Sequence, residues 1–246
     1  MSRESMHIET DVLIIGSGGA GMYAAIAATR AGAGVMLVDR SLIGRGGATV
    51  MAQMTVAAAL GSEIPDHWSH HYDDTLAAGR GLCDERLAQL LCEAGPDCIR
   101  EMDAWGVGWA RRQGRIAQAL APGHDRPRCV YVDFLNTGPA VSKTLRGVIT
   151  RAGGIRKAGD LLIVDLVRAG GEVTGAAALH VSSGAGVTIA PRRPSLPPAA
   201  SPGSTAATAP PPIWAATVTR LRCAQARRLS TWNSFSSSRS ATWRRA

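Results

Sequence analysis

Residues 11–39 constrain the fold of this chain more than any other segment. The run from Asp11 to Gly21 reads Asp-Val-Leu-Ile-Ile-Gly-Ser-Gly-Gly-Ala-Gly, and a second apolar run ends at Asp39. An apolar run without alternation is typical of a parallel strand buried on both faces, and an alanine-rich stretch favours a helix. The pattern predicts a strand, a helix and a second strand at 12–15, 22–31 and 35–38.

Each glycine of the turn between the first strand and the helix has its own physical role. Gly16 can adopt the positive φ that a sharp exit from the strand requires, and Gly18 has no Cβ to keep a pyrophosphate at a distance. Gly21 allows the helix to pack closely on the strand. The free N–H groups at the helix start then face the phosphates. We therefore predict that the turn residues bind a dinucleotide, namely Gly16, Ser17, Gly18, Ala20 and Gly21.

An acidic residue follows the second strand at the spacing that dinucleotide-binding units use. Asp39 lies 23 residues after Gly16, where a carboxylate accepts hydrogen bonds from a ribose hydroxyl. We predict that Asp39 and the adjacent Arg40 belong to the site. An aspartate disfavours a 2′-phosphate and hence NADP, while FAD and NAD both stay open. The alternative is an α/β crossover that binds no nucleotide.

The positive charge of the chain is confined to its C-terminal part. The net charge is +8, yet residues from 191 onward carry nine arginines, no lysine and no acid, so residues 1–190 carry −1. This balance argues against nucleic-acid binding by the folded part. The five cysteines form no Cys-x-x-Cys pair, which is typical of a reducing compartment. No signal peptide is evident, and the apolar run 48–60 is too short for a membrane span, so we expect a cytoplasmic protein.

Several later segments occur in an order that resembles a known family. Gly46-Gly47-Ala48-Thr49 leaves a backbone against which a flat ring system can lie. The further landmarks are Asp-x-Trp-x-x-His-x-Asp-Asp-Thr at 66–75, Trp-Gly-Val at 105–107, and Gly-His-x-x-Pro-Arg-Cys at 123–129. With the first motif they resemble the FAD-binding domain of the fumarate reductase / succinate dehydrogenase flavoprotein-subunit family, the FAD-binding-2 group, which includes aspartate oxidases. The resemblance covers about residues 9–190.

The resemblance implies an α/β fold, a Rossmann-like FAD-binding domain with a parallel sheet and a β-meander, incomplete in this chain. Residues 155–189 fit the meander, with Gly170-Gly171 as a hairpin turn. Respiratory members carry a histidine bonded covalently to the flavin where this chain has Ala48, so FAD is expected to be non-covalent. Met54-Thr55 replaces a glycine pair of the family. The further residues implied at the flavin are Gly47, Ala48, Thr49 and Thr55.

The family's chemistry is hydride transfer through FAD at a CH–CH or CH–NH group of a dicarboxylate-like substrate, with a possible electron-transfer subunit. The substrate-binding arginines and histidines belong to a capping domain that has no counterpart here, so we assign no catalytic residue. We expect this chain alone to be inactive and at best a weak FAD binder. His71 and His124 lie in matched segments, and we expect structural roles for both. Asp73 and Asp74 are expected to form a solvated acidic helix face.

The composition changes abruptly at Pro191, which divides the chain into a partial FAD-binding domain, 1–190, and a basic tail, 191–246. By composition the tail is disordered. We favour another origin, a frameshift at about 187–193. Shifted by one frame, the codons of 194–199 permit Val-Leu-Ala-Thr-Gly-Gly, and later codons permit the family's Gly-Asp-Gly and Met-Glu-Phe-x-Gln-Phe in order. A parallel sheet that lacks the lost strand exposes an unpaired edge.

Two other functions stay open on the sequence alone. The first is an NAD-binding dehydrogenase domain, against which the loop 46–49 argues. The second is a nucleic-acid-binding protein that uses its arginine-rich tail. A preference for NAD over FAD would favour the first, and steeply salt-dependent binding lost with residues 191–246 would favour the second.

Overall fold

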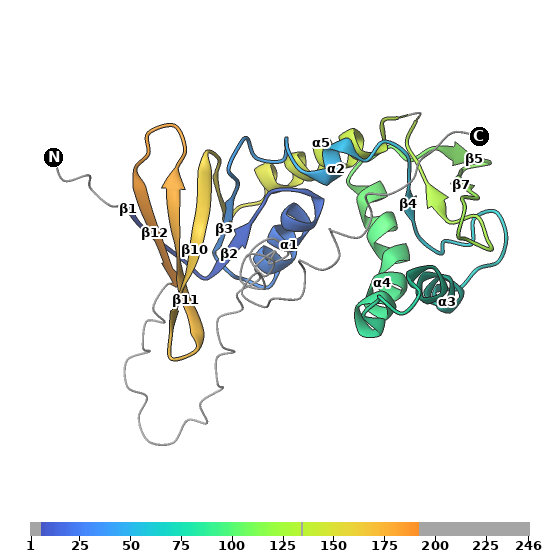
Figure 1. Ribbon diagram of the computed structural model, residues 1–246. Coiled ribbons are helices and arrows are strands. Elements are labelled where there is room, and N and C mark those ends of the chain that lie inside the picture. The colour runs from blue at the N-terminus through green and yellow to red at the C-terminus, as the bar shows by residue number, and fades with distance from the viewer. Residues whose placement is uncertain (1–5, 134, 192–246) are drawn as a thin grey trace, which may run out of the picture.

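The structure is a computed structural model, and it describes residues 6–133 and 135–191. The predicted basic tail, apart from its first residue, lies outside the described residues. The described part has three layers, with a β-sheet, a second β-sheet and helices packed in succession (Figure 1).

The central sheet contains the predicted βαβ unit. Strands β2 (Val12–Ile15) and β3 (Val35–Val38) pair in parallel around helix α1 (Gly19–Arg30), and β9 (Ile155–Ala158) pairs in parallel with β3. The order is therefore β2-β3-β9. Both predicted strands are confirmed. The helix begins three residues earlier than predicted because the glycine-rich turn itself enters helical geometry directly after Gly18.

The outer sheet contains the predicted meander. Its order is β1-β12-β11-β10, and the strands are β1 (Met6–Thr10), β12 (Gly186–Pro191), β11 (Glu172–His180) and β10 (Leu161–Ala169). The turn between β10 and β11 is the predicted glycine pair, and both residues have positive φ, +59° at Gly170 and +86° at Gly171. The hairpin prediction is confirmed, because these two residues supply conformations that L side chains rarely adopt.

Two apolar clusters lie on opposite faces of the central sheet. Side chains alternate along β2 and β3, so that Ile14 and Leu37 face the helices while Leu13 and Met36 face the outer sheet. Ile14 and Leu37 are fully buried. This explains the continuous apolar runs at 12–15 and 35–38, since a strand covered on both faces has no polar side.

The remaining elements lie on the other side of α1 from the outer sheet (Figure 1). The helices are α2 (Ala48–Met51), α3 (Trp68–Gly79), α4 (Glu85–Ala104) and α5 (Thr137–Arg151). The short strands are β4 (Val56–Ala57), β5 (Arg111–Arg112), β6 (Arg115–Ile116), β7 (Gln118–Ala119) and β8 (Cys129–Val130). β4, β8 and β7 form one antiparallel sheet, and β5 pairs with β6.

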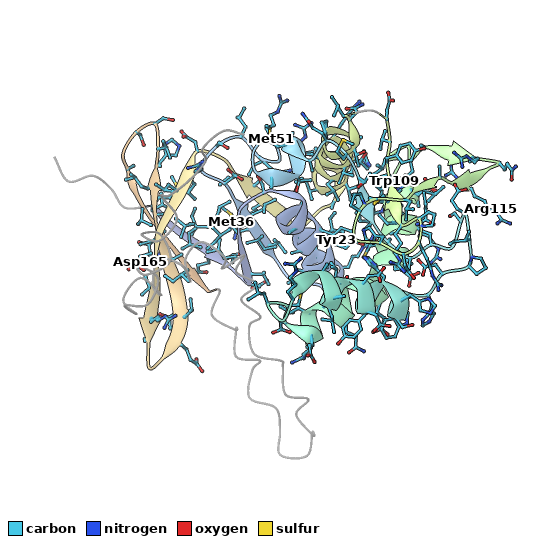
Figure 2. All side chains as sticks on the ribbon, turned by 45° about the vertical axis from the view of Figure 1, so that its right-hand side comes forward. Tyr23, Met36, Met51, Trp109, Arg115 and Asp165 are labelled. Atoms are coloured by element: carbon cyan, nitrogen blue, oxygen red, sulfur yellow. The ribbon has the colours of Figure 1, made fainter. Side chains whose placement is uncertain are left out.

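Polar side chains fix α1 against α4. The Tyr23 hydroxyl, which extends from α1 towards α4 in Figure 2, donates to a carboxylate oxygen of Glu101, and Arg30 donates to the other oxygen. The Arg30 guanidinium also lies 5.4 Å from the centre of the Trp105 ring, which in turn contacts Tyr23. The orientation of the glycine-turn helix is therefore set by α4 as well as by the sheet.

A buried arginine organises the part of the chain around α3. Arg128 is fully buried and donates to the carboxylates of Asp66, Asp74 and Asp125. Asp74 lies on α3, so our expectation of a solvated acidic face is wrong at this position. Local sequence could not indicate this contact, because Asp74 and Arg128 are 54 residues apart in the chain. Asp73 is exposed, as expected.

The two histidines of the matched segments are neighbours. The rings of His71 and His124 lie 5.6 Å apart between centres, and neither Nδ1 has a hydrogen-bond partner within the described ranges. Burial lowers the pKa of His71, and the nearby positive charge of Arg128 and the His124 ring lower it further. The neutral imidazole is therefore the form that this environment stabilises.

Candidate cofactor-binding site

A cleft of about 510 Å³ opens at the carboxyl ends of β2 and β3. Open parallel sheets bind ligands at this edge, and the cleft volume falls within the range of about 300–1,000 Å³ that is common for small-molecule sites. Its floor is the glycine turn after β2, one side is the segment after β3, and the opposite side is β10. The lining residues are Ile15, Gly16, Ser17, Gly18, Val38, Asp39, Arg40, Ser41, Gly46, Gly47, Ala48, Leu161, Leu162 and Ile163.

The glycine turn has the geometry that the motif predicts. Gly16 has φ +98°, a conformation that L side chains rarely adopt. A Cβ on Gly21 would lie 1.9 Å from the carbonyl oxygen of Gly16 and 3.5 Å from a methyl group of Ile14, so only glycine permits this approach of α1 to β2. A Cβ on Gly18 would meet nothing closer than 3.8 Å, which leaves the cleft side of the turn open.

The N-terminus of α1 is available to an anionic ligand. Gly18 caps the helix without a side-chain hydrogen bond, and the first turn contains no acidic residue. The Gly19 N–H donates to the Thr49 hydroxyl oxygen at 2.9 Å. This contact holds the second glycine segment against the first, and Gly47, with φ +83°, passes beside Gly18. A helix N-terminus that faces a cleft attracts phosphate through its N–H groups and its dipole.

Asp39 holds the glycine turn as well as lining the cleft. Its Oδ2 accepts from the Ser17 N–H at 2.9 Å and from the Ser17 hydroxyl at 2.6 Å, and its Oδ1 accepts from the Ser41 N–H at 3.0 Å. Burial works to raise the pKa of Asp39, but these hydrogen bonds outweigh it and hold the pKa below its ordinary value. The side chain is therefore a carboxylate at neutral pH, with both oxygens already in hydrogen bonds.

Ser17 connects this carboxylate to the helix layer. The Ser17 side chain is fully buried, and its hydroxyl oxygen accepts from the Gly44 N–H at 2.7 Å. The carbonyl of Gly44 accepts in turn from the Ser142 hydroxyl on α5, also at 2.7 Å. These hydrogen bonds, which run from Asp39 through Ser17 and Gly44 to Ser142, hold the turn from both sides.

The structure brings together seven of the eleven predicted site residues in the wall of the cleft: Gly16, Ser17, Gly18, Asp39, Arg40, Gly47 and Ala48. Ala20 and Gly21 lie within the first turn of α1 and do not line the cleft. Thr49 does not line it either, and its hydroxyl oxygen accepts from the Gly19 N–H. Thr55 is exposed, directly precedes β4 and is not among the residues that line the cleft. Sequence reasoning missed the β10 wall, Leu161–Ile163, because only the tertiary fold brings the meander to this edge. It also missed Ser41, which lies two residues after Asp39. A serine at this spacing from the acidic residue was the available signal.

Comparison with known proteins decides which dinucleotide family this cleft represents. A family profile described as "FAD binding domain" matches residues 11–196. The chain belongs to this FAD-binding family. It is the FAD-binding domain of the fumarate reductase and succinate dehydrogenase-like oxidoreductases, and its cofactor is FAD. The predicted family and fold class are confirmed. The glycine motif left both FAD and NAD open, and the family match identifies FAD.

The relatives are considerably longer than this chain. It is 36% identical over 176 residues to an L-aspartate oxidase of Streptomyces coelicolor, a match that covers 71% of this chain and 30% of that protein. It is 32% identical over 181 residues to a fumarate reductase (CoM/CoB) protein of Methanothermobacter marburgensis, covering 72% of this chain and 32% of that protein. The chain therefore spans about a third of the length of these relatives.

Solved structures show the same fold. The Mycobacterium smegmatis Sdh1 complex in the apo form aligns with a TM-score of 0.71 at 30% identity, over 76% of this chain and 33% of that chain. An Escherichia coli quinol fumarate reductase aligns with a TM-score of 0.71 at 27% identity, over 76% of this chain and 32% of that chain. In the part of this chain that the structure describes, every helix falls short of the length and apolar character needed to cross a membrane.

Proposed function

We propose that the cleft between the glycine turn and β10 holds FAD, with the pyrophosphate at the N-terminus of α1. The observation that supports this most directly is the glycine turn at the start of α1, which lines the cleft without an acidic side chain in the first turn of the helix, in a chain of an FAD-binding family. Gly16, Ser17, Gly18 and Ala20 supply the turn, and Gly21 sets its distance from β2. Asp39 and Arg40 then lie at the ribose, with Asp39 accepting hydrogen bonds from Ser17 and the sugar together.

The second glycine segment belongs to the flavin end of the site in this proposal. Gly47 and Thr49 contact the turn at Gly18 and Gly19, and Ala48 between them lines the cleft. Thr55 is assigned to this end by the family resemblance alone. A methyl group cannot form the covalent bond that a histidine makes to a flavin, and no histidine or cysteine is found among the lining residues of this cleft. The FAD is therefore held without a covalent bond.

The intact family protein would use this cofactor for hydride transfer. The names of the relatives specify aspartate, fumarate and succinate, so a small dicarboxylate is the proposed substrate class, and an electron-transfer subunit is a proposed partner. FAD supplies the redox chemistry, whereas the described residues bind and orient it. We assign no catalytic residue and propose that this chain alone does not turn over substrate. The described cysteines are free, which supports a cytoplasmic location.

Titration of the purified full chain with FAD tests this function. Quenching of flavin fluorescence should saturate at one FAD per chain, and acid precipitation of the protein should release all of the flavin into solution. Flavin that stays with the precipitate would contradict non-covalent binding. The variant Asp39→Ala should weaken FAD binding, whereas the exposed Asp165→Ala on β10 serves as a matched carboxylate control (Figure 2).

A further inference from the structure

A second groove, of about 610 Å³, lies between α5 and the segment that follows α4. Helix α4 ends close to α5 in Figure 1, and Trp105, Gly106 and Val107, which come directly after it, form one wall of the groove. The volume falls within the range of about 300–1,000 Å³ that is common for small-molecule sites. The groove shares no lining residue with the cofactor cleft, so a ligand bound here would be a second one.

The facing wall is one side of α5. Ala140, Thr144, Gly147 and Arg151 follow one another at intervals of four, three and four residues, and Lys143 lies four residues before Gly147. Residues at this spacing are neighbours on one face of a helix. Lys143 and Arg151 are eight residues apart, which is about 12 Å along the helix axis. The middle of this face therefore carries small residues, and positive charge lies on either side of Gly147.

The two cations of this face have no anionic partner among the described residues. Arg30 on α1, which lies over the Trp105 ring, pairs with Glu101. No ion pair or hydrogen bond joins Lys143 or Arg151 to any described part of the chain, and none of the described acidic residues lines the groove. The positive charge of the groove is therefore available to a ligand.

The Arg151 side chain turns back over the preceding turn of α5. A Cβ on Gly147 would lie 3.2 Å from the Nη1 of Arg151, so the guanidinium occupies the space that a side chain at position 147 would take. A guanidinium can bind a carboxylate through two parallel hydrogen bonds. A cation in the last turn is also favourable for the helix dipole, but this does not account for Lys143, which lies in the middle of α5.

Apolar groups complete the groove beside these charges. Trp105 and Val107 line it from the segment after α4, Val132 lies in the loop before α5, and Pro139 and Ala140 belong to the first turn of α5. Ligand sites commonly combine apolar and aromatic walls with a few polar groups that fix the orientation of the ligand. Two free cations beside apolar walls suit an organic anion with a flat apolar body.

We propose that this groove binds an aromatic carboxylate. Its carboxylate group lies at Arg151 and Lys143, and its ring lies against the 105–107 wall. The proposal goes beyond FAD binding and does not rest on it, because the two sites have no lining residue in common.

Titration of the full chain with 2-naphthoate, followed by two-dimensional proton–nitrogen NMR, tests this inference. The amide signals of Gly106 and Gly147 and the indole signal of Trp105 should shift and saturate with a Kd of about 1 mM or below. The amide signals of Gly16 and Gly18 in the cofactor cleft should stay unchanged.

Two further probes separate the contributions of charge and ring. The neutral 2-naphthamide has the same ring and should bind about tenfold more weakly, because it cannot form charge-assisted hydrogen bonds with both cations. Inorganic phosphate has the charge without the ring and should not saturate the groove in the same concentration range.

Substitutions of the two cations test the same site from the protein side. Lys143 and Arg151 are exposed, so Lys143→Gln and Arg151→Gln should leave the fold intact. Arg151→Gln should raise the Kd for 2-naphthoate about tenfold, and Lys143→Gln should raise it by a smaller factor. The exposed Arg86→Gln on α4 is the matched control and should leave the Kd unchanged.

Four results would overturn the proposal: no saturable shift at Gly106 and Gly147, shifts confined to the cofactor cleft, equal affinity for 2-naphthamide or phosphate, or an unchanged Kd in Arg151→Gln. FAD uptake is measured in a separate titration, so failure of the cofactor proposal would leave this result standing.

Discussion

The substitution Gly21→Ala should separate two roles of the glycine turn, the packing of α1 on β2 and the binding of FAD. The added Cβ would lie 1.9 Å from the Gly16 carbonyl oxygen, where ordinary contacts begin near 3.4 Å, so α1 must move away from β2 by more than an ångström. The obstacle is backbone, which cannot rotate aside as a side chain does. Overpacking of this kind costs about 1–3 kcal/mol. At about 2–4 °C per kcal/mol for a chain of this size, the Tm should fall by about 2–12 °C.

Gly18→Ala is the matched control, because its Cβ has 3.8 Å of space and its φ of −66° suits alanine. Without FAD its Tm should stay within about 4 °C of the parent, since helix caps of this kind differ by at most about 1 kcal/mol, at about 2–4 °C per kcal/mol. Its FAD Kd should nevertheless rise about tenfold, because the pyrophosphate loses close contact with the N–H groups of α1. Circular dichroism melts and flavin fluorescence titration measure the two effects. An unchanged melt for Gly21→Ala, or equal destabilisation by both variants, would refute the reasoning.

Three further predictions concern charged and titratable groups. Arg128→Met leaves the carboxylate of Asp66, with 1% of its side chain exposed, without its main partner and should cost about 3–5 kcal/mol in urea unfolding; a loss below about 1 kcal/mol would contradict this. Asp39 has a lowered pKa, so the stability it contributes is present above its unfolded pKa and is lost as pH falls through the folded value. Asp39→Asn should therefore make the free energy of unfolding depend less on pH in the acid range. An unchanged dependence would count against the Ser17 contacts. His71 has a pKa below its ordinary 6.5, so the folded state binds fewer protons and stability should fall as pH drops below about 6.5. His71→Asn should reduce that slope, and an unchanged slope would contradict this reasoning.

Local sequence patterns were sufficient for the elements that depend on neighbouring residues. The strands at 12–15 and 35–38, the helix after the glycine turn and the hairpin at Gly170-Gly171 each carry their determinants within a few residues. Apolar runs, alanine content and the conformational freedom of glycine specify them without knowledge of the rest of the chain. The family landmarks extended this to the fold class.

The contacts that shape the cleft could not be predicted from local sequence patterns. Ser17 and Asp39 are 22 residues apart and Ser142 is far beyond both, so only the packed fold reveals that they form one chain of hydrogen bonds. The pairing of Asp74 with Arg128 spans 54 residues and overturned the expectation of a solvated helix face. Motif spacing had suggested Asp39 solely as a sugar ligand, whereas its hydrogen bonds to the turn give it a positioning role as well.

Titration of the full chain with FAD, with NAD as competitor, tests the central claim most directly. We predict that FAD binds with quenching of its fluorescence, that NAD in excess does not displace it, and that Gly18→Ala weakens it without loss of the fold. A folded chain that takes up no FAD, or that releases it to an equal concentration of NAD, would contradict this claim.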